Sequence, residues 1–173
     1  MSDLRQQLER CLRGRVCFMG LGNSDYGDDG FGVRLAEKLV TAGVSDVILA
    51  GTAPDRWITQ LCGFDHVVFL DAVEFGGAVG DVVFLDSAQM ATRFPQISTH
   101  KISLGLLAWS IESDGKTRAW LLGVQPQSLA SPQLSSDVQN TLDALCELIK
   151  AVARIGAAPF KCPEQPLAAG VNP

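Results

Sequence analysis

The sequence predicts a single three-layer α/β/α domain, built on a twisted, mostly parallel five-stranded sheet with one antiparallel strand. Short apolar runs alternate with segments whose apolar residues recur at helical spacing, which is typical of this class. The chain has 173 residues, 47% hydrophobic and 19% charged, which suits one globular domain with a sizeable core.

Five compact apolar runs are predicted as strands, at residues 15–19, 46–50, 66–70, 80–85 and 118–124. The third run ends at Asp71. The link 74–79 between the third and fourth runs is short and rich in glycine. We therefore expect these two strands to form an antiparallel hairpin.

Helices are expected between the strands and at both ends of the domain. A lead-in helix is expected within 1–13, and four further helices follow. The first two have the apolar stripes Leu35, Ala36, Leu39 and Val40, and Trp57, Ile58 and Leu61. The third starts near 99–100 with Ile102, Leu106 and either Leu107 or Trp109, and the last has Val138, Leu142, Leu145, Ile149 and Val152. Ser136 and Gln139 could form a capping box for the last helix, which should stop at Gly156. The domain is expected to span 1–156, with 157–173 a flexible tail rich in proline and alanine.

Composition excludes several classes of function. The net charge of −5 argues against a nucleic-acid partner. The five cysteines are odd in number and form no C-x-x-C pair, so neither a disulfide framework nor a thiolate zinc site is indicated. Without a signal-like segment or a long apolar run, we expect a cytoplasmic monomer with no membrane insertion.

Ligands of parallel sheets bind beyond the carboxyl ends of the strands. Residues 23–29, 52–55 and Asp71 each follow a predicted strand, so all should lie at that edge. The glycine turn after the first strand is not a dinucleotide fingerprint, because Asp25 replaces the third glycine and adds negative charge.

Two carboxylates and an imidazole are the strongest candidates for chemistry. No serine or cysteine nucleophile is paired with a histidine base in any recognisable motif. Asp29, Asp71 and His100 would suit a divalent first-row metal with open coordination positions. The alternatives are structural: Asp28 or Asp29 as a helix cap, Asp71 as a turn cap, and His100 as a polar group at a helix start.

Four motifs in order resemble the hydrogenase maturation endopeptidases. They are GLGNSDYGDDGFG at 20–32, FLDAV at 69–73, STH at 98–100 before the leucines of 104–107, and LGVQP at 122–126. The turn GTAP at 51–54 looks closest to the branch that serves formate-hydrogenlyase-type hydrogenases.

The resemblance implies an endopeptidase that removes a C-terminal peptide from the precursor of a [NiFe]-hydrogenase large subunit. It implies that Asp29, Asp71 and His100 are both the catalytic and the metal-contacting residues, and that Asp28 is a cap or supporting carboxylate. The resemblance also implies that the metal is nickel supplied by the substrate, for which zinc or cadmium is expected to substitute in a crystal. One departure is the stretch LAGT at 49–52, which lacks the acidic residue of many relatives and leaves open a role for Asp55.

Two other functions remain as alternatives. Peptidyl-tRNA hydrolases share the G-L-G-N turn, but here no histidine follows it until His66, which we interpret as structural. A non-enzymatic nickel chaperone could use the same three ligands without cutting.

Overall fold

The computed structural model describes residues 2–61, 63–94, 103–113 and 115–156. Its sheet has the strand order β2-β1-β3-β5-β4, in which β1, β2, β3 and β5 are parallel and β4 is antiparallel to β5. The strands are β1 (Val16–Leu21), β2 (Val47–Gly51), β3 (His66–Ala72), β4 (Val82–Asp86) and β5 (Arg118–Val124). The predicted fold class is confirmed.

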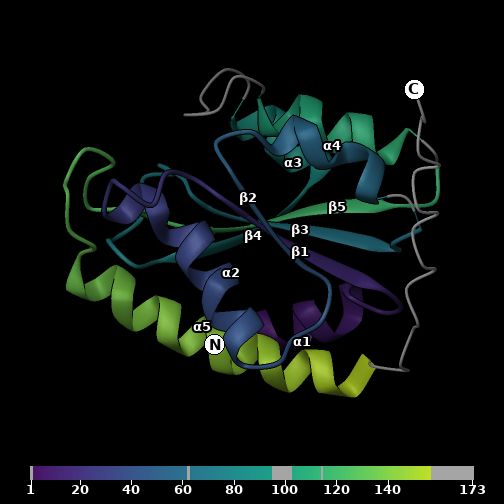
Figure 1. The fold of residues 1–173 in the computed structure, drawn as a ribbon, viewed down its shortest axis with the longest axis horizontal. Coiled ribbons are helices and arrows are strands. Elements are labelled where there is room, and N and C mark those ends of the chain that lie inside the picture. The colour runs from purple at the N-terminus through teal and green to yellow at the C-terminus, as the bar shows by residue number, and fades with distance from the viewer. Residues whose placement is uncertain (1, 62, 95–102, 114, 157–173) are drawn as a thin grey trace, which may run out of the picture.

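Helices cover both faces of this sheet (Figure 1). On one face lie α1 (Ser2–Cys11), α2 (Phe31–Thr41) and α5 (Ser136–Gly156). On the other lie the 3-10 helix η2 (Pro54–Leu61), α3 (Ser87–Arg93) and α4 (Leu104–Glu112). A short 3-10 helix, η1 (Asp28–Gly30), leads directly into α2.

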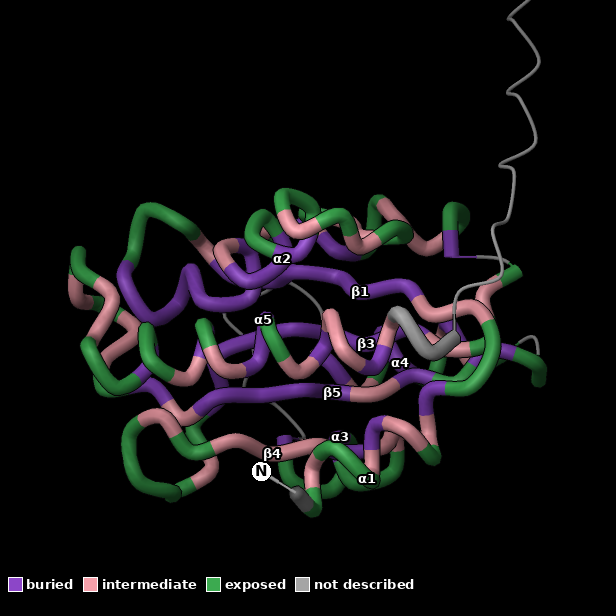
Figure 2. The backbone as a smooth tube through the Cα atoms, turned by 90° about the horizontal axis from the view of Figure 1, so that it is seen from below, coloured by how far each residue is buried: buried purple, intermediate pink, exposed green. Residues whose placement is uncertain are grey.

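Two hydrophobic cores sandwich the central strands. Side chains of β1, β3 and β5 alternate between the two faces, so Val68 and Leu70 join the α2–α5 core while Phe69 and Leu121 join the α3–α4 core. Figure 2 shows these three strands buried along most of their length and β4 only partly so. Burial of each leucine or phenylalanine side chain contributes about 1.5–3 kcal/mol to the stability of the fold. The two cores therefore hold the central strands firmly in place.

The predicted β3–β4 hairpin is wrong. β5 lies between these two strands, parallel to β3 and antiparallel to β4. The physical reason lies in how apolar each strand is: β5 buries most of its residues and suits the interior of the sheet, whereas β4 is half-buried and suits its edge.

The predicted helix before β5 corresponds to α4, which buries a different stripe; its predicted start near 99–100 and Ile102 lie outside the described residues. α4 begins at Leu104, with the Ser103 hydroxyl accepting a hydrogen bond from the Leu106 N–H. Leu107 is buried, but Leu106 and Trp109 are exposed. The buried stripe is instead the i, i+3, i+4, i+7 set of Leu104, Leu107, Ala108 and Ile111.

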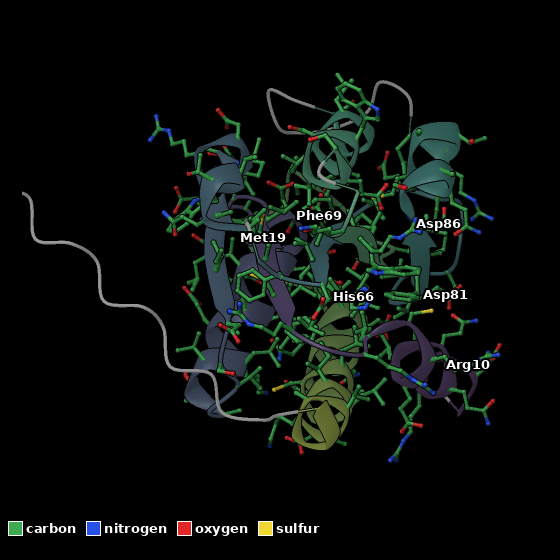
Figure 3. The ribbon with its side chains drawn as sticks, turned by 90° about the vertical axis from the view of Figure 1, so that its right-hand side faces the viewer. Arg10, Met19, His66, Phe69, Asp81 and Asp86 are labelled. Atoms are coloured by element: carbon green, nitrogen blue, oxygen red, sulfur yellow. The ribbon has the colours of Figure 1, made fainter. Side chains whose placement is uncertain are left out.

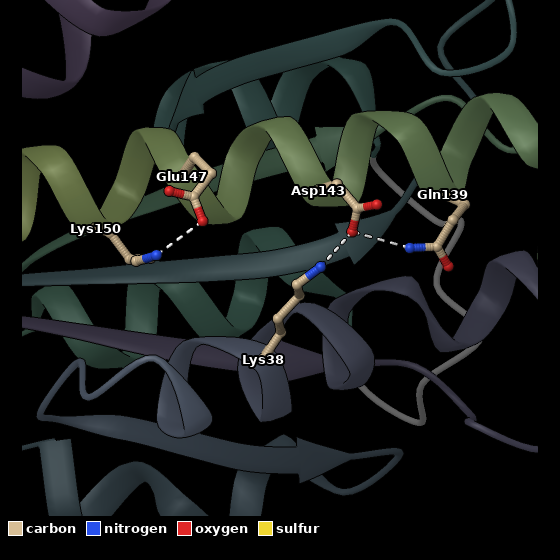
Figure 4. A network of polar contacts seen from close by, with 5 residues as sticks. All are labelled: Lys38, Gln139, Asp143, Glu147 and Lys150. Atoms are coloured by element: carbon tan, nitrogen blue, oxygen red, sulfur yellow. Dashed lines mark hydrogen bonds and ion pairs between the residues drawn. The ribbon is translucent and has the colours of Figure 1, made fainter.

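A capping box occurs, but not where it was predicted. Asp86 and Gln89 form one at the start of α3, a helix that the sequence analysis missed. At α5, Ser136 is already helical and the Gln139 amide donates to Asp143. Asp143 also accepts an ion pair from Lys38 of α2, which joins two helices of the same layer (Figure 4). Both partners of this ion pair are about half exposed, so it orients the helices more than it stabilises them.

Candidate active site

The turn between β1 and α2 is built by glycines that let η1 lie against the strand ends. Gly22 has φ +106°, and a Cβ there would lie 1.8 Å from the backbone oxygen of Asp29. A larger residue would therefore push η1, and Asp29 with it, away from the end of β1.

A second close approach joins α2 to β3. A Cβ on Gly32 would lie 1.9 Å from the backbone oxygen of Leu70 and 2.5 Å from that of Leu21. The first turn of α2 therefore rests on the ends of both β1 and β3. Because Asp29 precedes this turn and Asp71 follows Leu70, the two carboxylates are held at the same edge of the sheet.

The Asp29 carboxylate is buried but only partly hydrogen-bonded. Asp29 is 5% exposed, and its Oδ2 accepts a 3.0 Å hydrogen bond from the Asn23 N–H. Oδ1 is fully buried and has no hydrogen-bond partner among the described residues. Asp29 does not cap α2, whose N-cap is Gly30 with no side-chain hydrogen bond. A buried carboxylate oxygen without a donor is energetically costly, so this oxygen could accept a donor or a cation from a bound partner.

Asp71 occupies the second-last position of β3 and is 3% exposed. Its Oδ1 accepts a 2.9 Å hydrogen bond from the N–H of Ala72. Asp71 is paired in register with Gly123 of β5, so it is a strand residue and not a turn cap as the structural alternative required.

Asp28 has a structural role that the sequence did not reveal. It is 1% exposed and accepts hydrogen bonds from the N–H groups of Gln127 (2.8 Å), Ser128 (3.4 Å) and Ser135 (2.7 Å) and from the Ser135 hydroxyl (3.0 Å). The Gly27 N–H also donates to Ser131. The cap that was considered for Asp28 is therefore wrong, since this carboxylate instead fastens the β5–α5 loop over the β1–α2 turn.

The third predicted site residue, His100, lies outside the described residues. In the described part of the chain, no three His, Cys, Asp or Glu residues are grouped closely enough to hold a metal ion. Asp29 and Asp71 are thus the part of the predicted triad that the structure places. Asp55, the residue considered as a substitute, is exposed in the first turn of η2.

Neither His66 nor Cys17 offers a competing active centre. His66 is the first residue of β3 and so lies at the opposite, amino edge of the sheet, where its Nδ1 accepts a 3.1 Å hydrogen bond from the Trp120 indole. Burial lowers the pKa of His66, which favours its neutral form. Burial raises the pKa of the Cys17 thiol to about 12, which keeps it an unreactive core side chain. Trp57 packs partly buried against the α3–α4 core, as predicted.

Over the residues that the structure covers, no helix is long and apolar enough to cross a membrane.

Comparison with known proteins agrees with this geometry. Residues 33–152 match the family model HycI, described as hydrogenase maturation protease. The hydrogenase 3 maturation protease of Escherichia coli K12 is 32% identical over 110 residues, which cover 61% of this chain and 69% of that protein.

Solved structures of such proteases share the fold. The [NiFe] hydrogenase maturation protease HycI of Thermococcus kodakarensis superposes with a TM-score of 0.74 at 29% identity, covering 86% of this chain and 99% of that one. The maturating endopeptidase HybD of E. coli gives 0.68 at 26% identity, covering 82% and 93%. The family match decides against both a peptidyl-tRNA hydrolase and a non-enzymatic chaperone, because the matched proteins are peptidases. The chain therefore belongs to the hydrogenase maturation protease family, and it is a hydrolase of peptide bonds.

Proposed function

We propose that this protein removes a C-terminal peptide from a nickel-loaded [NiFe]-hydrogenase large-subunit precursor, and that nickel is the element it recognises. The observation that carries the proposal is the Asp29 carboxylate, whose buried Oδ1 has no donor among the described residues and lies at the sheet edge that also holds Asp71. A cation brought by the substrate would supply the missing partner.

The donor set fits nickel that is already bound to the precursor. Carboxylate oxygens and an imidazole are hard or borderline ligands, and without a thiolate they form a weak, open site. Two neighbouring carboxylates also repel each other unless a cation lies between them. We therefore assign Asp29, Asp71 and His100 as contacts to the nickel that are added to the ligands it already has in the precursor.

The described side chains support peptide cleavage without a covalent thiol intermediate. Cys17 is buried, and burial also raises the pKa of the Cys146 thiol on α5. His66 lies at the far edge of the sheet, so it cannot act as a general base on a water molecule at the carboxylate edge. Hydrolysis then depends on water at the carboxylate edge.

The test is processing of the precursor by site variants. We expect Asp29→Asn, Asp71→Asn and His100→Ala each to abolish the mass change of the large subunit while the circular dichroism spectrum stays that of the wild type. Asp55→Asn is the matched control, because this exposed carboxylate lies near the same edge and should be dispensable. Wild-type processing by any of the three site variants would remove that residue from the assignment.

Among hydrogenases, we propose a substrate from the formate-hydrogenlyase-type branch. The support is the turn at 51–54 and the similarity to the E. coli hydrogenase 3 maturation protease. Incubation with nickel-loaded precursors of two hydrogenase types tests this, and faster cutting of the other type would refute it.

A further inference from the structure

Among the described strands, β4 and β2 are the two edge strands of the sheet. β4 pairs with β5 on one side only. No backbone hydrogen bond of the described residues reaches its other side. An uncovered edge of this kind offers its N–H and C=O groups to another extended chain.

The register shows which groups of β4 point outward. The Gln125 N–H donates to the backbone oxygen of Asp81, so position 81 faces β5. The Asp86 N–H donates instead to the Gln89 side chain, so position 86 faces away from β5. Antiparallel pairs alternate between these two orientations. The backbone groups of Val82 and Phe84 therefore point to the open side.

A pocket of about 310 Å³ opens beside the first residues of this edge. Its lining includes Leu4 of α1, Gly80, Val82, and Thr141, Ala144 and Leu145 of α5. The Thr141 hydroxyl already donates a 2.8 Å hydrogen bond to the Gly80 oxygen, and Asp81 is the one charged residue among the described residues of the lining, beside the aliphatic Leu4, Val82, Ala144 and Leu145. The pocket would accept one apolar side chain of a strand paired with β4.

This edge is continuous with the active site. Gly123 of β5 is paired with Asp71 on one side and with Val83 on the other. With strands about 4.8 Å apart, a strand added to β4 would lie about 14 Å from β3. About four extended residues cover that distance, at about 3.3 Å per residue. β4 also starts at the carboxyl edge and runs away from it, so a chain leaving the site would run parallel to β4.

Two carboxylates flank this edge. Asp81, just before β4, and Asp86, its last residue, lie on the outer side of the sheet, where Arg10 of α1 also lies (Figure 3). Glu74 is exposed on the preceding loop, and the sequence contains no lysine or arginine from residue 64 to residue 92. A bound segment should therefore carry basic side chains.

We propose that the outer edge of β4 binds the C-terminal segment of the large-subunit precursor, downstream of the scissile bond, as an added parallel strand. Val82 and Phe84 supply the backbone hydrogen bonds, the pocket takes an apolar side chain, and Asp81 and Asp86 attract basic ones. The inference rests on the proposed function, since it names where that same substrate is held.

Amide hydrogen exchange tests the binding without relying on cleavage. The probe is a synthetic peptide with the sequence of the released C-terminal segment, added to the full-length enzyme. We expect exchange at Val82 and Phe84 to slow at least about tenfold, because these amides gain acceptors, while Val83 and Leu85 are already protected by β5. Unchanged exchange at Val82 and Phe84 at saturating peptide would overturn the inference.

Two variants test the same edge in catalysis on the intact precursor. Val82→Pro removes an outward N–H but no bond to β5, and Ala144→Phe fills the pocket. Each should raise KM by about tenfold with kcat within about twofold, the loss expected for one or two hydrogen bonds or one buried side chain. Asn140→Phe is the matched control, because Asn140 is exposed on the same helix and does not line the pocket, and it should leave KM unchanged.

The outcomes separate this inference from the proposed function. If the folded wild type leaves the nickel-loaded precursor uncut, the proposed function is wrong. If it cuts the precursor while folded Val82→Pro and Ala144→Phe keep the wild-type KM, only the strand addition is wrong.

Discussion

Neighbouring aspartates in η1 should respond in opposite ways to the same substitution. Asp28→Asn replaces one oxygen of a carboxylate that accepts four hydrogen bonds from the β5–α5 loop. With the amide oxygen in the place of Oδ2, which accepts three of the bonds, the new NH₂ group would face the Ser135 N–H, so that bond should be lost and the other three should lose a charged acceptor. A hydrogen bond to a charged group contributes about 1.5–3 kcal/mol, and partial rearrangement reduces the sum to about 2–4 kcal/mol.

Asp29→Asn should cost much less stability. The amide oxygen would take the place of Oδ2 and keep the bond from the Asn23 N–H. Its NH₂ would take the place of Oδ1, which bonds to none of the described residues. We expect a change within about 1 kcal/mol, together with complete loss of processing.

Urea denaturation of both variants at pH 7, followed by circular dichroism, measures the difference. The midpoint should fall clearly for Asp28→Asn and stay near the wild type for Asp29→Asn, with the same slope in all three proteins. Residual processing by Asp28→Asn at low temperature would agree with a structural role. Equal destabilisation by the two substitutions would refute the distinction between a fastening and a functional carboxylate.

Three further predictions concern other parts of the molecule. Thiol alkylators should leave activity intact, because Cys17 is buried with its pKa raised to about 12; inactivation that tracks with a Cys17 adduct in folded protein would contradict this. The free energy of unfolding should fall as the pH drops below about 6.5, because burial lowers the pKa of His66 in the folded state and the unfolded state therefore binds the proton more readily. Urea titrations of His66→Gln from pH 7 to 5 should show a smaller loss than those of the wild type. Gly32→Ala should destabilise the protein by at least about 2 kcal/mol, since its Cβ would overlap the backbone oxygen of Leu70, and a wild-type melting temperature would show that α2 does not rest on β3 as described.

The sequence predicted the fold class because apolar runs and helical stripes are local signals. It missed the order of β4 and β5, because chain proximity favoured a hairpin and only the burial of whole strands distinguishes a central from an edge position. It also selected Leu106 and Trp109 for a helix stripe, because three-residue spacing fits the exposed face of α4 as well as the buried one.

The site was predicted in part for the same reason. Asp29 and Asp71 follow strands, so the rule for parallel sheets placed them at one edge. The role of Asp28 depends on Gln127 and Ser135, about a hundred residues away, and no local pattern reports such a contact. The run of serines and prolines after β5 was the available signal, since such loops need polar groups to fix them.

The central claim is tested most directly by offering the enzyme matched precursors of the large subunit with and without nickel. We predict that mass spectrometry shows one C-terminal cut in the nickel-loaded precursor and none in the nickel-free one. We also predict that metal analysis finds no stoichiometric nickel in enzyme purified without chelator. Efficient cutting of the nickel-free precursor, or tightly bound nickel in the isolated enzyme, would contradict the account.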